Sequence, residues 1–77
     1  MDREVFLLQL KDQFIDADEI SVTWTKPFRE IGSFDSLTGM AIIVMIKDEF
    51  GVDISEQEFK ACLTPGDIYA LAVSKAG

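Results

Sequence analysis

One serine stands where another enzyme could modify a hydroxyl. Ser36 follows a loop and opens a strongly apolar stretch with helical spacing. A phosphodiester at the start of a helix would lie against free N–H groups and the positive end of the helix dipole. Asp35, directly before it, offers a carboxylate that can help hold a metal ion during phosphate transfer. These residue types predict that Ser36 is a substrate for modification.

The same serine lacks the groups that would make it a catalytic nucleophile. Neither His nor Lys stands beside it, and the chain contains no His at all. The usual general base at neutral pH and the commonest metal ligand are therefore missing. We expect no enzymatic activity and no metal site. A plain helix cap is the alternative interpretation of Ser36, because serine is common at helix starts.

Four helices are expected to position this serine. Apolar residues recur at three- and four-residue steps, which predicts helices over about residues 2–15, 36–50, 55–62 and 64–75. The second is apolar nearly all round, which is typical of a central helix or of one with an exposed face for a partner. We therefore predict an all-α fold. It is a small antiparallel four-helix bundle with three longer helices and one short one.

Capping residues support the ends of these helices. Gly51 suits the C-terminal cap of the second helix. Ser55 and Glu58 fit a capping box at the start of the short third helix. Thr64 followed by Pro65 places a capping hydroxyl before a proline at the first helical position.

A long ordered loop is predicted between the first and second helices, over residues 16–35. A loop of this length is unusual in a compact domain unless it is functional. Five apolar residues are expected to hold it on the core: Ile20, Val22, Trp24, Phe28 and Ile31.

The composition excludes several classes of function. The 77 residues, 48% of them hydrophobic, suffice for a single domain over 1–77. The formal net charge of −7 disfavours nucleic acid and favours partners that present Lys and Arg. The chain shows no signal peptide and no apolar run long enough to span a membrane. With a single cysteine, these observations predict a cytoplasmic protein without membrane insertion. We expect it to be a monomer.

Asp35-Ser36-Leu37, at the start of an apolar helix, resembles the Asp-Ser-Leu signature of acyl and peptidyl carrier proteins. The resemblance covers nearly the whole chain, which gives the tripeptide its weight. Phe28 matches the buried loop aromatic of that family. Residues 48–54 resemble its acidic-Phe-Gly turn, and residues 64–68 resemble the Thr-x-x-Asp-Leu start of its last helix.

The resemblance implies that a phosphopantetheinyl transferase moves a 4′-phosphopantetheine arm from coenzyme A to Ser36. A thiol at the tip of the arm then holds the cargo as a thioester. Asp35 and Leu37 are implied contacts of the transferase, and Met40 and Ala41 are further candidate partner contacts. The other implied partners are acyl-handling synthases or ligases of fatty acid, polyketide or a related specialised pathway.

Two alternatives to an acyl carrier remain open. An aminoacyl or peptidyl carrier would share Ser36 and the fold, although the acidity of the chain favours acyl cargo. An unmodified helical interaction module would instead use the apolar second helix for docking.

Two stretches differ from the carriers of fatty acid synthesis. Those carriers usually have acids early in the second helix, where this chain has Thr38, Met40 and Ala41. Ser33-Phe34 replaces the common Gly-Ala or Gly-Met before the aspartate. Basic partners would thus meet a more apolar and less charged surface. Our hypothesis is a carrier dedicated to one specialised pathway.

Overall fold

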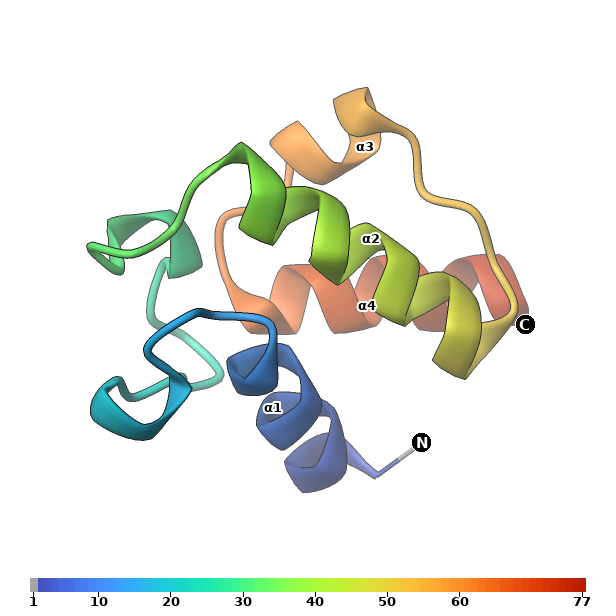
Figure 1. Cartoon of the computed structure of the whole chain (residues 1–77). Coiled ribbons are helices and arrows are strands. Elements are labelled where there is room, and N and C mark those ends of the chain that lie inside the picture. The colour runs from blue at the N-terminus through green and yellow to red at the C-terminus, as the bar shows by residue number, and fades with distance from the viewer. Residues whose placement is uncertain (1) are drawn as a thin grey trace.

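The computed structural model describes residues 2–77 and contains helices and turns but no strand within that range (Figure 1). The α-helices are α1 (Arg3–Asp12), α2 (Ser36–Phe50), α3 (Glu56–Lys60) and α4 (Pro65–Ala76), and the 3-10 turns are η1 (Ala17–Glu19) and η2 (Phe28–Glu30). The predicted small helical bundle with one short helix is confirmed. Among the described residues, no helix combines the length and apolar character that a bilayer crossing requires.

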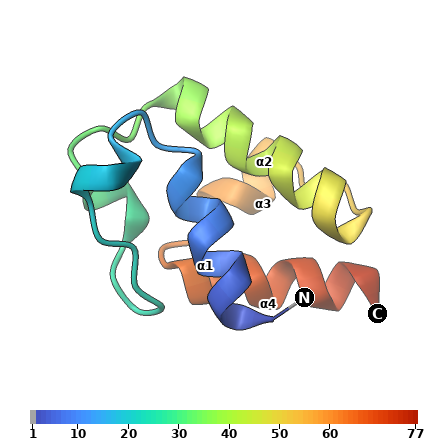
Figure 2. The same ribbon diagram turned by 60° about the horizontal axis from the view of Figure 1, so that its bottom comes forward.

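The four helices are arranged so that α2 and α4 run in the same direction (Figures 1 and 2). The short helix α3 and the segments on either side of it return the chain to the end where α2 begins. As a result α3 lies beside the N-terminal half of α2, next to Ser36.

The predicted end of the first helix near Ile15 is wrong, because the chain tightens into a turn after Asp12. The N–H groups of Gln13 and Phe14 donate to carbonyls three residues back, at 3.1 and 3.0 Å. Such bonds are typical of a closing last turn. The turn directs Phe14 into the core and leaves Ile15 93% exposed.

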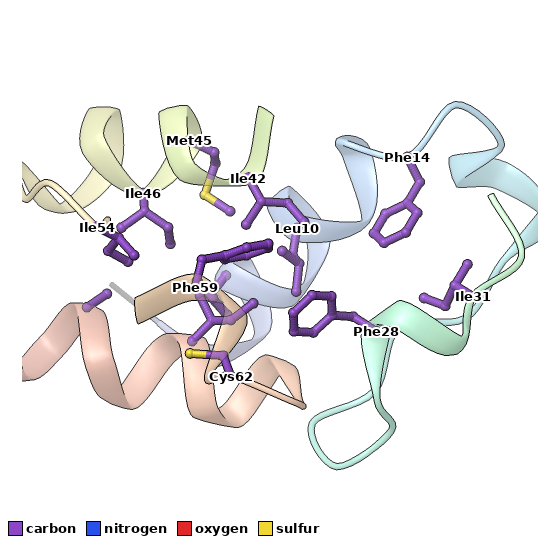
Figure 3. Close-up of a cluster of buried hydrophobic side chains, with 13 residues drawn as sticks. Leu10, Phe14, Phe28, Ile31, Ile42, Met45, Ile46, Ile54, Phe59 and Cys62 are labelled. Atoms are coloured by element: carbon purple, nitrogen blue, oxygen red, sulfur yellow. The ribbon is translucent and has the colours of Figure 1, made fainter. Parts of the chain in front are cut away.

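Side chains from all four helices and from the α1–α2 loop form one core. Its buried members are Phe6, Leu10, Phe14, Phe28, Ile31, Ile42, Met45, Ile46, Ile54, Phe59, Cys62, Ile68 and Ala72. Figure 3 shows Ile42 and Met45 of α2 pointing toward Phe59 of α3. Full burial of one large apolar side chain contributes about 1.5–3 kcal/mol, so this cluster is the main source of stability.

Phenylalanine rings form a continuous chain of contacts beneath the start of α2. The ring centroids of Phe14 and Phe34 lie 6.2 Å apart, and those of Phe34 and Phe28 lie 5.5 Å apart. Phe59 continues the chain at 5.4 Å from Phe28. Edge-to-face and tilted pairs at these distances stabilise beyond their burial alone. The rings therefore give the loop a fixed position against α3.

The long segment between α1 and α2 lies at one end of the bundle and is ordered, as predicted (Figures 1 and 2). Phe28 and Ile31 are buried in the core. Ile20, Val22 and Trp24 are partly buried against it. The two 3-10 turns within this segment were not predicted from the sequence.

Two backbone hydrogen bonds join this loop to the α3–α4 connection and to the first turn of α4. Phe28 N–H donates to the Leu63 carbonyl at 3.2 Å, and Gly66 N–H donates to the Trp24 carbonyl at 3.0 Å. A side chain at Gly66 would lie 3.0 Å from Trp24 Nε1, so only glycine lets the indole lie this close to α4. On its other side Trp24 contacts Arg3, whose guanidinium carbon lies 4.9 Å from the ring centroid.

Candidate functional site

Asp35 forms the cap of α2. Its Oδ1 accepts hydrogen bonds from Thr38 N–H at 2.8 Å and from Thr38 Oγ1 at 3.0 Å. These bonds, the backbone bond above all, hold the pKa of Asp35 below its ordinary value, so the carboxylate stays ionised at neutral pH. The alternative that Ser36 is itself the cap is wrong, because Asp35 performs that role.

Ser36 is the first helical residue of α2 and is exposed. A residue at this position has no intrahelical partner for its N–H, and the positive end of the helix dipole lies there. No described residue forms a hydrogen bond with the Ser36 hydroxyl in residues 2–77. The hydroxyl is therefore accessible to a second protein.

The loop before α2 fixes where this serine lies. Ser33 Oγ donates to Asp16 Oδ1 at 2.5 Å, which joins the two ends of the loop. Phe34 N–H donates to the Ile31 carbonyl at 2.9 Å. Together with the ring contacts of Phe34, these bonds fix the position of the residues that lead into α2.

One face of α2 is apolar and exposed. Leu37, Met40 and Val44 follow one another at helical spacing and are 75%, 59% and 57% exposed. Ala41, between them, is half-buried. The two methionines of α2 thus have different environments, since Met45 is buried in the core. The exposed apolar face begins one residue after Ser36.

A second face of α2 borders a groove of about 340 Å³ between α2 and α3. Its α2 wall consists of Ser36, Gly39, Met40 and Ile43, which lie on one face of the helix. Phe34 and Phe59 form the opposite wall. The serine hydroxyl thus stands at the mouth of a largely apolar groove.

Gly39 allows this groove to be closely packed at its base. A Cβ on Gly39 would lie 3.3 Å from Phe59 Cε2 and 3.4 Å from Phe34 Cζ. Glycine inside a helix costs up to about 1 kcal/mol relative to alanine, so its presence here has a packing reason. Gly39 was not predicted as a functional residue, although an isolated glycine within a helical pattern is a usable signal.

Arg29 links the loop to α3 and was also missed. Its Nη2 donates to the Phe59 carbonyl at 2.8 Å, and its Nη1 donates to the Cys62 carbonyl. These carbonyls lie at the C-terminal end of α3 and in the turn that follows it, where a cation is favourable. The partners of Arg29 lie about 30 positions away in the sequence, so no local pattern predicts them. The available signal was that Arg29 is one of the few bases in an acidic chain.

Cys62 takes no part in this site. The thiol is buried, donates to the Glu58 carbonyl at 3.5 Å, and has its pKa raised by burial. A buried thiol with a raised pKa is a poor nucleophile. Cys62 is a member of the hydrophobic core.

A small helical bundle that exposes a serine at the start of its second helix, beside an apolar groove, has the features of a phosphopantetheine carrier domain. The family model described as "phosphopantetheine attachment site" matches residues 6–72, which is most of the chain. The chain belongs to this family. No curated protein and no solved structure gave a match.

The family match confirms the predicted resemblance to carrier proteins and the predicted prosthetic group. This domain is the site of covalent 4′-phosphopantetheine attachment, and carrier domains of this kind are not themselves catalytic. The start of α2 fits such a group, because it offers an accessible hydroxyl and the N–H end of a helix for a phosphodiester.

Proposed function

We propose that the chain is an acyl carrier protein and that Ser36 carries the phosphopantetheine arm. The observation that carries the proposal is the exposed Ser36 at the first position of α2, with Asp35 as the cap. The arm, when attached, supplies a thiol that holds cargo as a thioester. The chain's own residues present the arm and do no chemistry on the cargo.

The residues at the start of α2 have separate tasks in loading. Asp35 keeps the first turn in place through its bonds to Thr38. Ser36 Oγ loses its proton and forms the bond to phosphorus, while the pyrophosphate bond of coenzyme A breaks and the nucleotide part leaves. Within residues 2–77 no side chain forms a hydrogen bond with the Ser36 hydroxyl, so we assign the acceptance of that proton to the phosphopantetheinyl transferase.

The exposed apolar face of α2 supports a role in partner recognition. We infer that Leu37, Met40 and Ala41, with Asp35, contact the transferase and the acyl-handling synthases or ligases. Apolar residues this exposed lose much water-accessible area when a partner covers them. Replacing Leu37 by Ala should therefore slow loading without lowering the stability of the free protein, as a loading time course and a melting curve would reveal.

The groove beside Ser36 supports acyl rather than aminoacyl cargo. Its walls are apolar at Phe34, Met40, Ile43 and Phe59, and a charged amino group would lose hydration there. The net charge of −7 agrees with basic partners of the acyl-handling kind. Competing loading reactions with fatty acyl and aminoacyl ligases would separate this function from that of an aminoacyl or peptidyl carrier.

Early in α2 this chain has Thr38, Met40 and Ala41 where carriers of fatty acid synthesis usually have acidic residues. This difference supports a role in a specialised pathway. We further infer a single monomeric, non-catalytic carrier domain over residues 1–77 in the cytoplasm, because the arm's thiol must remain reduced to be loaded. Elongation of the loaded protein by fatty acid synthesis enzymes at the rate of a general carrier would contradict the specialised role.

The decisive experiment is intact mass after incubation with coenzyme A and a transferase. We expect the native chain to gain the mass of one phosphopantetheine group and the Ser36→Ala variant to gain none. Ser33→Ala is the matched control, because Ser33 lies in the same segment but its hydroxyl is bonded to Asp16. It should still be loaded.

Either of two results would overturn the assignment. If the Ser36→Ala variant were loaded, the arm would have to be attached to another residue. A native chain that gains no mass would favour the unmodified interaction module instead.

A further inference from the structure

Two cations, Arg29 and Lys60, line the same groove as Ser36 in a chain with few bases. We propose that Lys60 and Arg29 hold the phosphodiester of the arm, so that the arm leaves Ser36 over the α2–α3 groove. Both side chains line the same groove as the serine. The inference rests on the attachment at Ser36 proposed above.

Neither cation is neutralised by a carboxylate. The chain has seven basic and fourteen acidic residues, and two of the bases form ion pairs within residues 2–77. Within residues 2–77 the ion pairs join Lys47 to Asp53 and Lys75 to Glu58, and they include neither Lys60 nor Arg29. Two unneutralised bases beside one serine favour an anion at that place.

Arg29 is already fixed in position. Besides its bonds to the carbonyls of Phe59 and Cys62, its guanidinium carbon lies 4.7 Å from the Phe28 ring centroid and 5.1 Å from that of Phe59. A guanidinium has five N–H donors, so donors remain for a phosphate oxygen. Because the side chain is already ordered, little further entropy is lost when it meets an anion.

Lys60 completes the arrangement from the end of α3. It is exposed, and its ammonium is a compact charge on a flexible stem that adapts to a neighbouring phosphate. The N-terminal end of α2 adds positive potential at Ser36. Glu56 also lines the groove and opposes the two cations. The attraction is exposed to solvent and should therefore weaken with salt.

Phosphorus NMR of the loaded full-length chain tests the placement. We expect the phosphodiester resonance of the native protein to shift as sodium chloride is raised, because salt competes with the two cations. Lys60→Met should reduce that shift by about half, since one of two cations is removed. Transverse relaxation of the phosphorus should also slow as the arm becomes more mobile.

Two further variants test whether the shift changes in the expected direction and only near Ser36. Glu56→Gln removes the opposing carboxylate and should enlarge the salt-dependent shift. Lys47→Met is the matched control. It removes a lysine about 16 Å along α2 from Ser36, at 1.5 Å per residue, and should behave as the native protein does.

The outcomes separate this inference from the proposed function. If the arm attaches but Lys60→Met and Glu56→Gln both leave the phosphorus signal unchanged, the placement is overturned and attachment at Ser36 stands. If intact mass detects no arm, both fail together.

Discussion

Because Asp35 caps α2, the hydroxyl of the neighbouring Ser36 remains available for modification. Serine is itself a good cap, and a capping hydroxyl would be bonded to the helix backbone. Here Asp35 closes the first turn through Thr38, so the neighbouring hydroxyl is left for another enzyme. The Asp35 carboxylate thus takes the capping role that would otherwise occupy the Ser36 hydroxyl.

Gly39 gives the first prediction, which concerns the base of the groove. Gly39→Ala would ordinarily stabilise a helix by up to about 1 kcal/mol. Here the added methyl group would lie 3.3 Å from Phe59 Cε2, so this buried ring, which packs against Phe28, would have to shift. Overpacking costs about 1–3 kcal/mol, so we expect a net loss of about 1 kcal/mol in urea unfolding.

Gly32 provides the control for that substitution. A Cβ at Gly32 meets no atom within 4 Å. Gly32→Ala should change the free energy of unfolding by less than about 0.5 kcal/mol. A Gly39→Ala variant that is more stable than the native chain would show that the rings yield to the methyl group.

At the scale of elements, the start of α4 depends on one ionised carboxylate. Asp67 Oδ2 accepts from Leu63 N–H at 2.9 Å and from Thr64 N–H at 3.1 Å, while Thr64 Oγ1 accepts from Asp67 N–H at 3.2 Å. These backbone bonds, with Leu63 first, lower the pKa of Asp67. Folding therefore favours the ionised form of this side chain.

The second prediction is the pH dependence that follows. A lowered folded pKa means that Asp67 contributes its full stabilisation above its ordinary pKa of 3.8. The contribution is lost as the pH falls below 3.8 through the lowered value. We expect Asp67→Asn to be less stable than the native chain at pH 6, with the difference shrinking toward zero in acid. Urea unfolding at a series of pH values measures it.

Asp18→Asn is the control for Asp67→Asn. It removes the same charge from η1, away from any α-helix start. Because the Asp18 side chain forms no hydrogen bond within residues 2–77, this variant should be about as stable as the native chain at pH 6. An Asp67→Asn difference that grows as the pH falls would contradict the assigned sign.

Local signals in the sequence predicted the elements well. Ser55 with Glu58 and Thr64 with Asp67 form the capping boxes that start α3 and α4, and each needs only neighbouring residues. Gly51, in the left-handed conformation at φ 70°, ends α2 as expected. The predicted range of α2 agrees with the structure because its signals are equally local.

Contacts between distant residues could not be predicted in the same way. The bonds of Arg29 to the Phe59 carbonyl and the approach of Phe59 to Gly39 depend on how the loop and α3 fold back against α2. No periodicity in the sequence encodes that path. The position of Ser36 was therefore foreseen from local pattern, whereas the groove and the cations beside it required the structure.

At the scale of the whole molecule, net charge is the dominant electrostatic property. Fourteen acids and seven bases give a formal charge of −7 on a chain of 77 residues. The ion pairs seen within residues 2–77, such as Lys47 with Asp53, are solvent-exposed and contribute little. Repulsion among the acids should thus lower the stability of the folded state.

The third prediction is that salt stabilises the protein. Screening weakens the mutual repulsion over distances beyond about 8 Å at physiological ionic strength. We expect the midpoint of thermal unfolding to rise as sodium chloride increases from low to physiological concentration. Asp18→Lys should raise the low-salt midpoint and reduce the salt effect, while Lys26→Glu should do the reverse. A midpoint of thermal unfolding that falls with salt would show that the ion pairs stabilise the fold more than the repulsion among the acids destabilises it.

The lone tryptophan lies at the seam where α1, the loop and the start of α4 meet, between Arg3 and Gly66. Separation of these three segments would remove the cation from the indole face and wet the ring. Intrinsic fluorescence is therefore a label-free reporter of this seam. The same signal, followed while the protein is loaded or bound by an enzyme, would tell whether events at α2 loosen this seam.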